Sequence, residues 1–380
     1  MKQKLIILFL SLVSSFGLCA QETSGIYNNL TWSLIDGVLT ISGNGDMVRR
    51  SDANYPWLPY MEDDTCIHSL IVEEGVTSIA RAAFNWCQNL KNVHLPYSLQ
   101  IIEGFAFDGC KNLQSVNILS ADSIGLWAFC NTNKPYWLVS HFDIICNTAT
   151  PPHAHEGAFY LHDTQEYTDP IFATVYVPAG SLEAYNNTFP WNTLPIRPFC
   201  SVSDIGWASF YLDYNAKVPE GITVYYAKSA TDSTITLSPI EAGITIPANT
   251  AIIVRADEGA HAFIESSDTP ITLTNNLLEG VTEDTNVSPN SVYVLADGNS
   301  STCIFANYEG TTLGAYKAYI PKTSVPSNAA SIRFIIENQE TTTSIETNQH
   351  TNYATIKTIR NGEILILRNG SMYDIMGRRR

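Results

Sequence analysis

Apolar and polar positions follow a pattern that occurs three times between Ile67 and Asn131. The first copy, IHSLIVEEGVTSIARAAFNWCQN, spans Ile67–Asn89, and the second, LKNVHLPYSLQIIEGFAFDGCKN, spans Leu90–Asn112, so equivalent residues lie 23 positions apart. The third copy starts at Leu113 and is one residue shorter in its middle. A fixed period of about 20–29 residues, with leucine or isoleucine at fixed offsets, predicts a solenoid of stacked repeats.

Each copy opens with an extended stretch in which alternate residues are apolar, as Leu70 and Val72 show. One strand and its return segment cannot bury this apolar edge alone, so stacking the copies creates a common core and a parallel sheet. The residues between the apolar ones face outward, where they are either a binding surface or simply solvated strand positions. We select as candidate binding residues Ser69, Ile71, Glu73, Asn92, His94, Ser115, Asn117 and Leu119.

After each strand the chain continues with V-x-x-I and then AF-x-x-C-x-x-L. In the first copy this motif consists of Val76–Ile79, Ala83-Phe84, Cys87 and Leu90, and the second copy repeats it with leucine in the first position. The pattern resembles the BspA-like leucine-rich-repeat proteins of bacterial surfaces.

Two flanking segments extend this resemblance to about Ser24–Phe199. Leu30–Leu34 followed by Gly37–Gly43 is similar to the hairpin that commonly precedes such repeats, and Val175–Ser181 with Trp191 is similar to their closing segment. The resemblance implies a surface or secreted binding protein, and some relatives are adhesins. We expect protein recognition through the strand face, without catalysis. It implies no particular ligand, because a fold does not define a function.

From Ser201 to Glu337 the chain consists of short alternating runs separated by Gly, Pro, Asn and Asp. This spacing predicts an antiparallel β-sandwich or jelly-roll-like domain. The predicted fold class is mainly β, with a short leucine-rich-repeat solenoid of parallel strands and short helical returns, followed by an antiparallel β-sandwich-like domain. The predicted domains are a signal peptide at 1–20, an N-terminal β-hairpin cap at 21–65, the repeat domain at 66–199, the β-sandwich-like domain at 200–338, and a linker with a small β tail at 339–380.

The first 20 residues have the features of a secretory signal, with Lys2 and Lys4 before the apolar stretch Leu5–Val13. Cys19 leaves a lipoprotein open as an alternative, although Leu18 stands where a small residue is usual. No second apolar run is long enough for a transmembrane helix. We therefore expect an exported protein that is secreted or located at the cell surface in association with the outer membrane.

The end of the chain, Met372–Arg378, resembles the C-terminal sorting segment of Gram-negative surface proteins. It departs from that pattern because the sequence stops at Arg380, before the strand that normally follows. A working sorting signal and a vestigial tail both remain open.

The net charge of the chain limits the classes of molecule that it can bind. The chain has 21 basic and 37 acidic side chains, and its formal net charge is −16. Such an acidic protein is poorly suited to bind nucleic-acid phosphates or anionic lipid. The expected partner is an extracellular or host protein, or alternatively a glycan, and we expect no cofactor.

The sequence contains no G-x-S-x-G, H-E-x-x-H, Walker or C-x-x-C motif. His153 and His155, with His162, form its densest histidine cluster, but their spacing fixes no further metal ligand, so we favour an exposed polar loop over a metal site. No two carboxylates can be placed across a cleft from the sequence. We therefore expect no enzymatic activity.

Seven cysteines follow the signal peptide, and export would favour disulfides. Cys87 and Cys110, however, occupy the same inward position of successive repeats, where the family that the chain resembles uses cysteine as a small buried residue. Stacked neighbours about 5 Å apart leave a bond geometrically open. We favour reduced, buried thiols in the repeats.

Two other functions remain open. One is a glycan-binding accessory protein in which Trp207, Tyr225 and Tyr226 form stacking platforms, although we favour a buried core as the place of these aromatic residues. The other is a hydrolase whose site is assembled only by the fold. An exposed aromatic strip would favour the first, and a deep cleft with facing carboxylates would favour the second.

Overall fold

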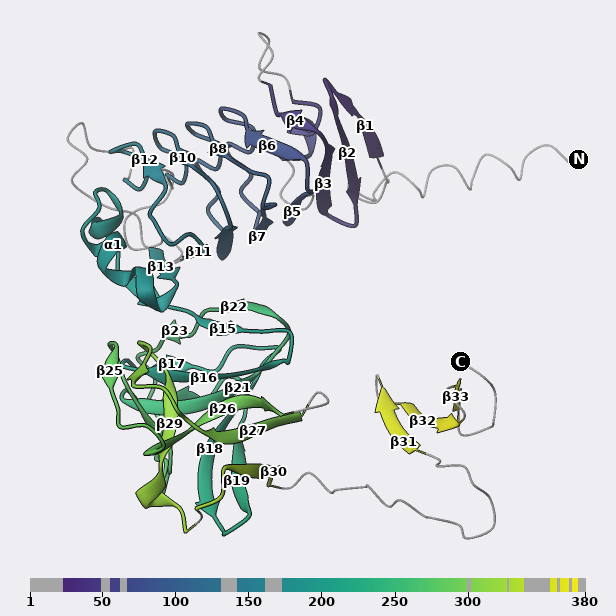
Figure 1. Cartoon of the computed structure of the whole chain (residues 1–380). Helices are drawn as coiled ribbons and strands as arrows, with labels where there is room; N and C mark the ends of the chain where they lie inside the picture. The colour runs from purple at the N-terminus through teal and green to yellow at the C-terminus, as the bar shows by residue number, and fades with distance from the viewer. Residues whose placement is uncertain are drawn as a thin grey trace, which may run out of the picture. The chain divides into compact units, whose positions relative to one another are not determined.

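The computed structural model describes residues 23–48, 55–61, 67–130, 142–160, 173–298, 302–326, 328–337, 356–360, 363–368 and 371–374. The predicted signal peptide, Cys66, His162, the linker and the last six residues lie outside the described residues. The chain divides after Phe334 into two compact units (Figure 1), and each is described by itself.

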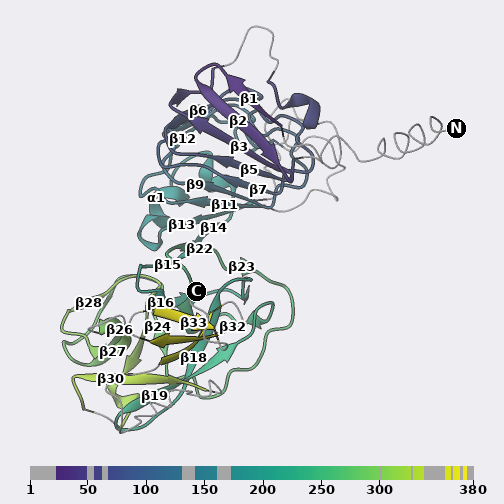
Figure 2. The same cartoon turned by 90° about the vertical axis from the view of Figure 1, so that its right-hand side faces the viewer.

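The first sheet of the repeat region has nine strands, which follow one another in chain order (Figure 2). The first three strands are antiparallel, and the predicted hairpin is confirmed, with positive φ at both turn residues Asp36 and Gly37. All later neighbours are parallel. The strands are β1 (Thr23–Tyr27), β2 (Leu30–Ile35), β3 (Val38–Gly43), β5 (Ser69–Val72), β7 (Asn92–His94), β9 (Ser115–Ile118), β11 (Phe142–Cys146), β13 (Ala173–Val177) and β14 (Ile196–Pro198).

The V-x-x-I segments of the three copies, together with one short strand before them and one after them, form a second parallel sheet of five strands (Figure 1). Each strand pairs with its equivalent in the next repeat, as Ser78 does with Ile101 and Ile101 with Ser123. Both sheets of the solenoid therefore repeat the period found in the sequence. The strands are β4 (Gly45–Asp46), β6 (Val76–Ile79), β8 (Ile101–Ile102), β10 (Ser123–Ile124) and β12 (His153–Ala154).

The expected short helical returns are replaced by this second strand and a series of turns. The equivalent residues Ala82, Phe105 and Trp127 have φ values of 57°, 62° and 54°, so the return cannot continue as a right-handed helix. Each of these three N–H groups donates to a carbonyl of the following repeat, at 2.9 to 3.2 Å. In the three clear copies the expected helical returns do not form, because these bonds between repeats override the local preference, whereas a 3-10 turn and a short helix do follow the strand Ala173–Val177. The mainly β fold class itself is confirmed.

A ladder of aromatic rings fills the core between the two sheets. Successive rings have centroids 4.7 to 6.3 Å apart, and the phenylalanine pairs are stacked. The buried indoles at the two ends donate their N–H groups to the carbonyls of Ala83 and Pro152 at 2.8 and 2.9 Å. These bonds satisfy the polar atom of each terminal ring, as burial requires. The ladder consists of Trp57, Phe84, Phe107, Phe129, Phe159 and Trp191.

The fourth repeat continues past Pro151-Pro152, where the sequence indicates a break. β12 joins the second sheet directly after the prolines, and Ala158-Phe159 takes the Ala-Phe position of the earlier copies. Further along the chain, β13 leads through a 3-10 turn at Ala179–Ser181 into the only helix among the described residues, α1 (Leu182–Asn186). Further 3-10 turns are Leu58–Tyr60, Trp191–Thr193 and Lys322–Ser324.

The β domain is built on a second nine-stranded sheet, and the predicted antiparallel domain is confirmed. Its edge strands come together, since a side chain at Gly280 of one edge would overlap the ring of Tyr211 on the other. The sheet is therefore nearly closed into a barrel. In spatial order its strands are β16 (Trp207–Leu212), β21 (Thr250–Arg255), β18 (Thr223–Ala230), β19 (Thr234–Ile240), β30 (Ser331–Ile336), β27 (Thr302–Asn307), β26 (Val292–Gly298), β29 (Ala318–Pro321) and β24 (Glu279–Gly280).

Small sheets of two or three short strands cover this barrel. The core of the β domain around Phe210 and Phe263 is separate from the core of the repeats. The small sheets pair β15 (Cys200–Val202) with β22 (Gly259–His261), β17 (Ala216–Lys217) with β20 (Thr245–Ile246) and β23 (Ile264–Glu265), and β25 (Thr285–Asn286) with β28 (Thr312–Leu313). The second unit contains an antiparallel sheet of β31 (Ile356–Arg360), β32 (Glu363–Arg368) and β33 (Ser371–Asp374).

Candidate recognition face

The register of the first sheet brings six of the eight candidate residues into two straight rows. Because the strands are parallel and unshifted, Ser69, Asn92 and Ser115 form one row. Ile71, His94 and Asn117 form the second row. Neighbours within a row lie about 4.8 Å apart, the spacing of adjacent strands. We call these two rows, together with their continuation on neighbouring strands, the outward face.

Burial confirms that these residues point away from the core. Leu70, Val93 and Val116 between them are at most 2% exposed, whereas Ile71 is 37% exposed. His94 is also exposed, and the remaining row members are half-buried. The other two candidates lie just beyond the strand ends, where Glu73 is exposed and Leu119 is half-buried.

The rows extend beyond the residues that the repeats indicated. Towards the cap they continue through Val38 and Thr40 of β3, which pair with Ser69 and Ile71. In the fourth repeat Ile145 pairs with Asn117 and continues the second row, whereas Asp143, which pairs with Ser115, is buried and ends the first row. The alternation within β3 and β11 carried this signal in the sequence, but neither strand belongs to the three clear copies.

The centre of the outward face is uncharged, although the whole chain has a formal net charge of −16. From β2 to β9 the two rows contain only serine, threonine, asparagine, histidine, valine and isoleucine. Charged side chains lie at the strand ends, with Lys91 directly before β7 and Glu73 directly after β5. Depletion of charged residues at the centre and a polar rim are two features of protein–protein interfaces.

An exposed aromatic residue that the sequence reasoning missed adjoins this face. Tyr97 follows β7 by three residues and is 62% exposed. Its loop is held in place because the Glu74 carboxylate accepts hydrogen bonds from the N–H groups of Tyr97 and Ser98 at 2.7 and 3.1 Å. The bond from Tyr97 N–H is the main reason why the pKa of Glu74 is lowered. An exposed tyrosine on an anchored loop can serve as a rigid binding anchor.

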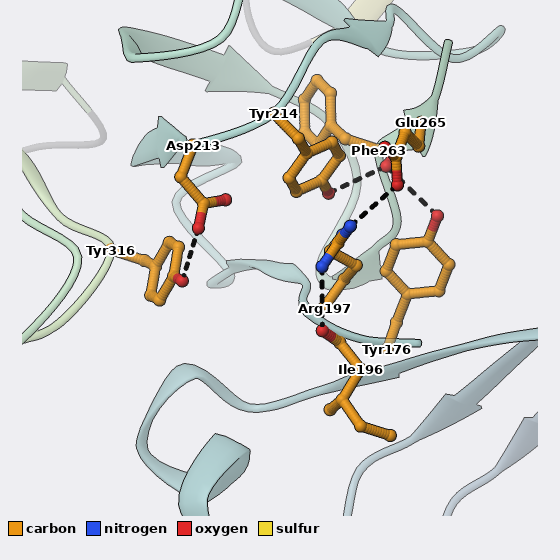
Figure 3. A network of polar contacts seen from close by, with 8 residues as sticks. All are labelled: Tyr176, Ile196, Arg197, Asp213, Tyr214, Phe263, Glu265 and Tyr316. Carbon is orange, nitrogen blue, oxygen red and sulfur yellow. Dashed lines mark hydrogen bonds and ion pairs between the residues drawn. The ribbon is translucent and has the colours of Figure 1, made fainter. Parts of the chain in front are cut away.

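At its C-terminal end the second row is covered. Tyr176 and Arg197, which continue the row beyond Ile145, contact the segment that carries β23 (Figure 3). Tyr176 donates its hydroxyl to the Phe263 carbonyl at 3.2 Å, and Arg197 forms an ion pair with Glu265 at 2.9 Å. These two residues are therefore used inside the protein rather than offered to a partner.

Tyr214 completes this junction from the β domain. Its hydroxyl donates to the same Phe263 carbonyl at 2.9 Å, and the Arg197 guanidinium lies 5.1 Å from its ring centre (Figure 3). Burial raises the pKa values of both Tyr176 and Tyr214. The two phenols therefore stay protonated and continue to donate at all physiological pH values.

The thiols of the repeats behave as small buried side chains. Cys87 and Cys110 are free, and they donate to the carbonyls of Ile67 and Phe84 at 3.9 and 3.2 Å. Burial raises the pKa of Cys87 to about 12 and that of Cys110 well above its ordinary value. Neither thiol supplies a nucleophilic thiolate near neutral pH.

Within the described ranges, no three His, Cys, Asp or Glu residues are placed to hold a metal ion. The His153 and His155 side chains are exposed. The backbone N–H groups of these residues continue the second sheet by donating to the backbone carbonyls of Asp122 and Ile124 at 2.9 and 2.8 Å. His155 also accepts a hydrogen bond from the N–H of Gly157 at 3.1 Å. The two histidines therefore belong to the fourth repeat.

The three aromatic residues considered for glycan binding form no exposed strip. Tyr225 is 2% exposed, and Tyr226 packs against the core of the β domain. Trp207 is half-buried, and its ring lies 5.0 Å from Phe334 and 5.4 Å from the Arg255 guanidinium. Its ring is occupied by neighbours within the protein.

Known proteins resemble the repeat region. The family described as BspA type leucine rich repeat region matches residues 61–142. A solved structure of a leucine-rich repeat protein from Eubacterium ventriosum is similar at 21% identity and a TM-score of 0.29, over 43% of this chain and 45% of that protein. The chain thus spans less than half of that protein. No curated protein matches the chain.

The family match confirms the resemblance of the repeats to BspA-type sequences. The resemblance of the chain's end to a sorting segment stays a prediction. In the part of the chain that the structure describes, no helix has the length and apolar character to cross a membrane.

Proposed function

We propose that this protein recognises another protein through the outward face, centred on Ile71, His94 and Asn117. The observation that carries the proposal is the alignment of uncharged side chains into two unbroken rows on a rigid sheet. Repeat solenoids commonly use such extended surfaces for binding. Rigid strands hold these side chains in place before a partner arrives, which lowers the entropic cost of association.

The size of the face sets the expected strength of binding. Five intervals between six strands, from β2 to β11, span about 24 Å, and two rows with their flanks cover about 13 Å along the strands. This area of roughly 300 Å² is below the ~800 Å² that each partner contributes to a standard interface. The partner must therefore also contact flanking loops, and Tyr97 is the best-placed residue to extend the contact.

The proposed partner is an extracellular or host protein, and the proposed location is the cell surface or the surrounding medium. The leader-like first 20 residues and the BspA-type repeats support this assignment. The absence of catalytic activity is part of the proposal. The raised pKa of the Cys87 thiol is consistent with it, since this thiol supplies no nucleophile near neutral pH.

Two isoleucines of equal size and similar exposure provide a matched test. Ile71 on the outward face is 37% exposed, and Ile101 on the second sheet is 41% exposed. The chain from Gln21 to Arg380 and its Ile71→Asp and Ile101→Asp variants would be applied to an array of extracellular-matrix and host-surface proteins. The affinity for each protein that gives a positive spot would then be measured by surface plasmon resonance.

We expect Ile71→Asp to weaken binding at least about tenfold, because it places an unpaired charge in the uncharged centre of the interface. Ile101→Asp should leave binding within about twofold, since its side chain lies on the other sheet. An equal loss of binding affinity in both variants would indicate general destabilisation and would contradict the assignment of binding to the outward face. Unchanged binding by Ile71→Asp would move recognition elsewhere on the protein.

A further inference from the structure

The β domain contains an open cavity at one mouth of the nearly closed barrel. It has a volume of about 670 Å³ and lies between the end of β16, the start of β21 and the edge strand β24. Barrel mouths are frequent positions for small-molecule sites, and such sites usually measure about 300–1,000 Å³. None of the described residues that line the cavity belongs to the outward face.

Tyr211 forms the aromatic wall of this cavity. It is half-buried, and its ring lies directly against Gly280 on the opposite edge of the barrel, where any side chain would overlap it. Its hydroxyl donates to the Asn249 side-chain oxygen at 3.3 Å. The glycine and the asparagine thus fix the ring at the cavity wall, and the ring surface that Gly280 leaves uncovered is available to a ligand.

The polar groups of the cavity disfavour an anionic ligand. Exposed Asn249, Thr272 and Glu279 line it, and no lysine, arginine or histidine is among the described residues that do so. A ligand carrying phosphate, sulfate or carboxylate groups would find no cation here. Glu279 already accepts a hydrogen bond from the Tyr319 hydroxyl at 3.1 Å, which orients its carboxylate.

The floor of the cavity is fastened by a single amide side chain. Asn276 donates to the Ala251 carbonyl at 2.8 Å and accepts from the N–H groups of Ala227 and Leu278 at 3.2 and 3.1 Å. These bonds join β21, β18 and the segment before β24. The site is therefore largely formed before a ligand binds, as small-molecule sites usually are.

We propose that this cavity binds a neutral saccharide. The C–H face of a sugar ring packs on Tyr211, and its hydroxyl groups bond to Asn249 and to the Glu279 carboxylate. The lining contains one carboxylate, whereas glycoside hydrolysis normally uses two across the scissile bond. The site is thus one of binding and not of hydrolysis.

A second cavity in the same domain supplies the control. It has a volume of about 520 Å³, and its lining includes Trp207, Asp297 and Lys317. The Trp207 ring is occupied by Phe334 and Arg255. Lys317 places a cation in this cavity, which the described residues that line the first cavity do not supply. Asp297→Asn here is the same chemical change as Glu279→Gln in the first cavity.

The test uses the full chain and isothermal titration with four neutral hexasaccharides, of β-1,4-glucose, β-1,4-mannose, α-1,4-glucose and β-1,4-N-acetylglucosamine. A heparin hexasaccharide serves as the anionic probe. We expect one neutral probe to bind with a dissociation constant of about 1 mM or below and heparin not to bind. Glu279→Gln and Tyr211→Leu should each weaken binding about tenfold or more, whereas Asp297→Asn should stay within about twofold.

Glu279 is exposed, so its variant should fold even if Tyr211→Leu disturbs the barrel edge. The proposal is overturned if no neutral probe binds at 10 mM, if heparin binds best, or if Asp297→Asn weakens binding as much as Glu279→Gln. The Ile71→Asp variant should bind the saccharide normally. Failure at this cavity is therefore distinguishable from failure of the outward face.

Discussion

Replacing Phe107 by alanine removes the middle of the aromatic ladder. The Phe107 side chain is 1% exposed and is stacked at 5.5 Å between Phe84 on one side and Phe129 on the other. A buried Phe→Ala exchange costs about 3–5 kcal/mol, and each lost stacked pair removes about 0.5–1.5 kcal/mol beyond area burial. We therefore expect a loss near the upper end, about 4–5 kcal/mol, in the free energy of unfolding of the repeats.

Phe105, two residues earlier, provides the matched control. It is half-buried and contacts Trp127 at 5.1 Å and the Arg81 guanidinium at 4.3 Å between ring or group centres. Losing these contacts in Phe105→Ala should cost about 1 kcal/mol. The same substitution thus has two different expected costs within one repeat.

Urea denaturation followed by tryptophan fluorescence measures this difference. Six of the seven tryptophans lie between residues 32 and 191, so the signal reports mainly on the repeats. Midpoints are comparable as free energies only where the transitions of both variants have the same slope. A cost for Phe107→Ala that is below about 1.5 kcal/mol, or no larger than that for Phe105→Ala, would refute the ladder as the core of the solenoid.

Three further changes test other parts of the molecule. The folded-state pKa of Cys87, about 12, exceeds the ordinary value of ~8.5, so stability should be lost as pH rises above about 8.5. Cys87→Ala should flatten that loss by about 1 kcal/mol per pH unit, as urea midpoints at pH 8 and 10.5 would show. Tyr176→Phe and Tyr214→Phe should each cost about 1 kcal/mol or less. Their double variant should cost more than the sum in a double-mutant cycle, because the Phe263 carbonyl then loses both donors. Tyr97→Ala should weaken partner binding about tenfold in surface plasmon resonance without changing the urea midpoint.

The repeat architecture could be predicted because equivalent residues recur at a fixed spacing along the chain. The 23-residue spacing alone placed Ser69, Asn92 and Ser115 in one row, and the structure puts them there. The same spacing could not reveal that Phe159 continues the ladder, because the fourth copy is interrupted by Pro151-Pro152 and is out of period. A motif search that tolerated insertions would have found Ala158-Phe159.

Features that depend on long-range contacts could not be predicted. The left-handed backbone at Phe105 and Trp127 is held by hydrogen bonds to the next repeat, so local preference wrongly favoured a helix. Tyr225 has the same sequence features whether it is a platform or a core residue, and only the closing of the barrel buries it. The cavity at Tyr211 requires Gly280, which lies 69 positions away in the sequence.

The two ends of the outward face differ, and this difference bears on how a partner docks. At the cap end the second row continues without obstruction through Thr40 to Ser33. At the other end Tyr176 and Arg197 are bonded to Phe263 and Glu265. Because those side chains are already engaged, a partner that covered them would have to break an ion pair and a buried hydrogen bond. The favourable footprint therefore extends from the centre of the face towards the cap, and substitutions at Thr40 should affect binding more than substitutions at Arg197.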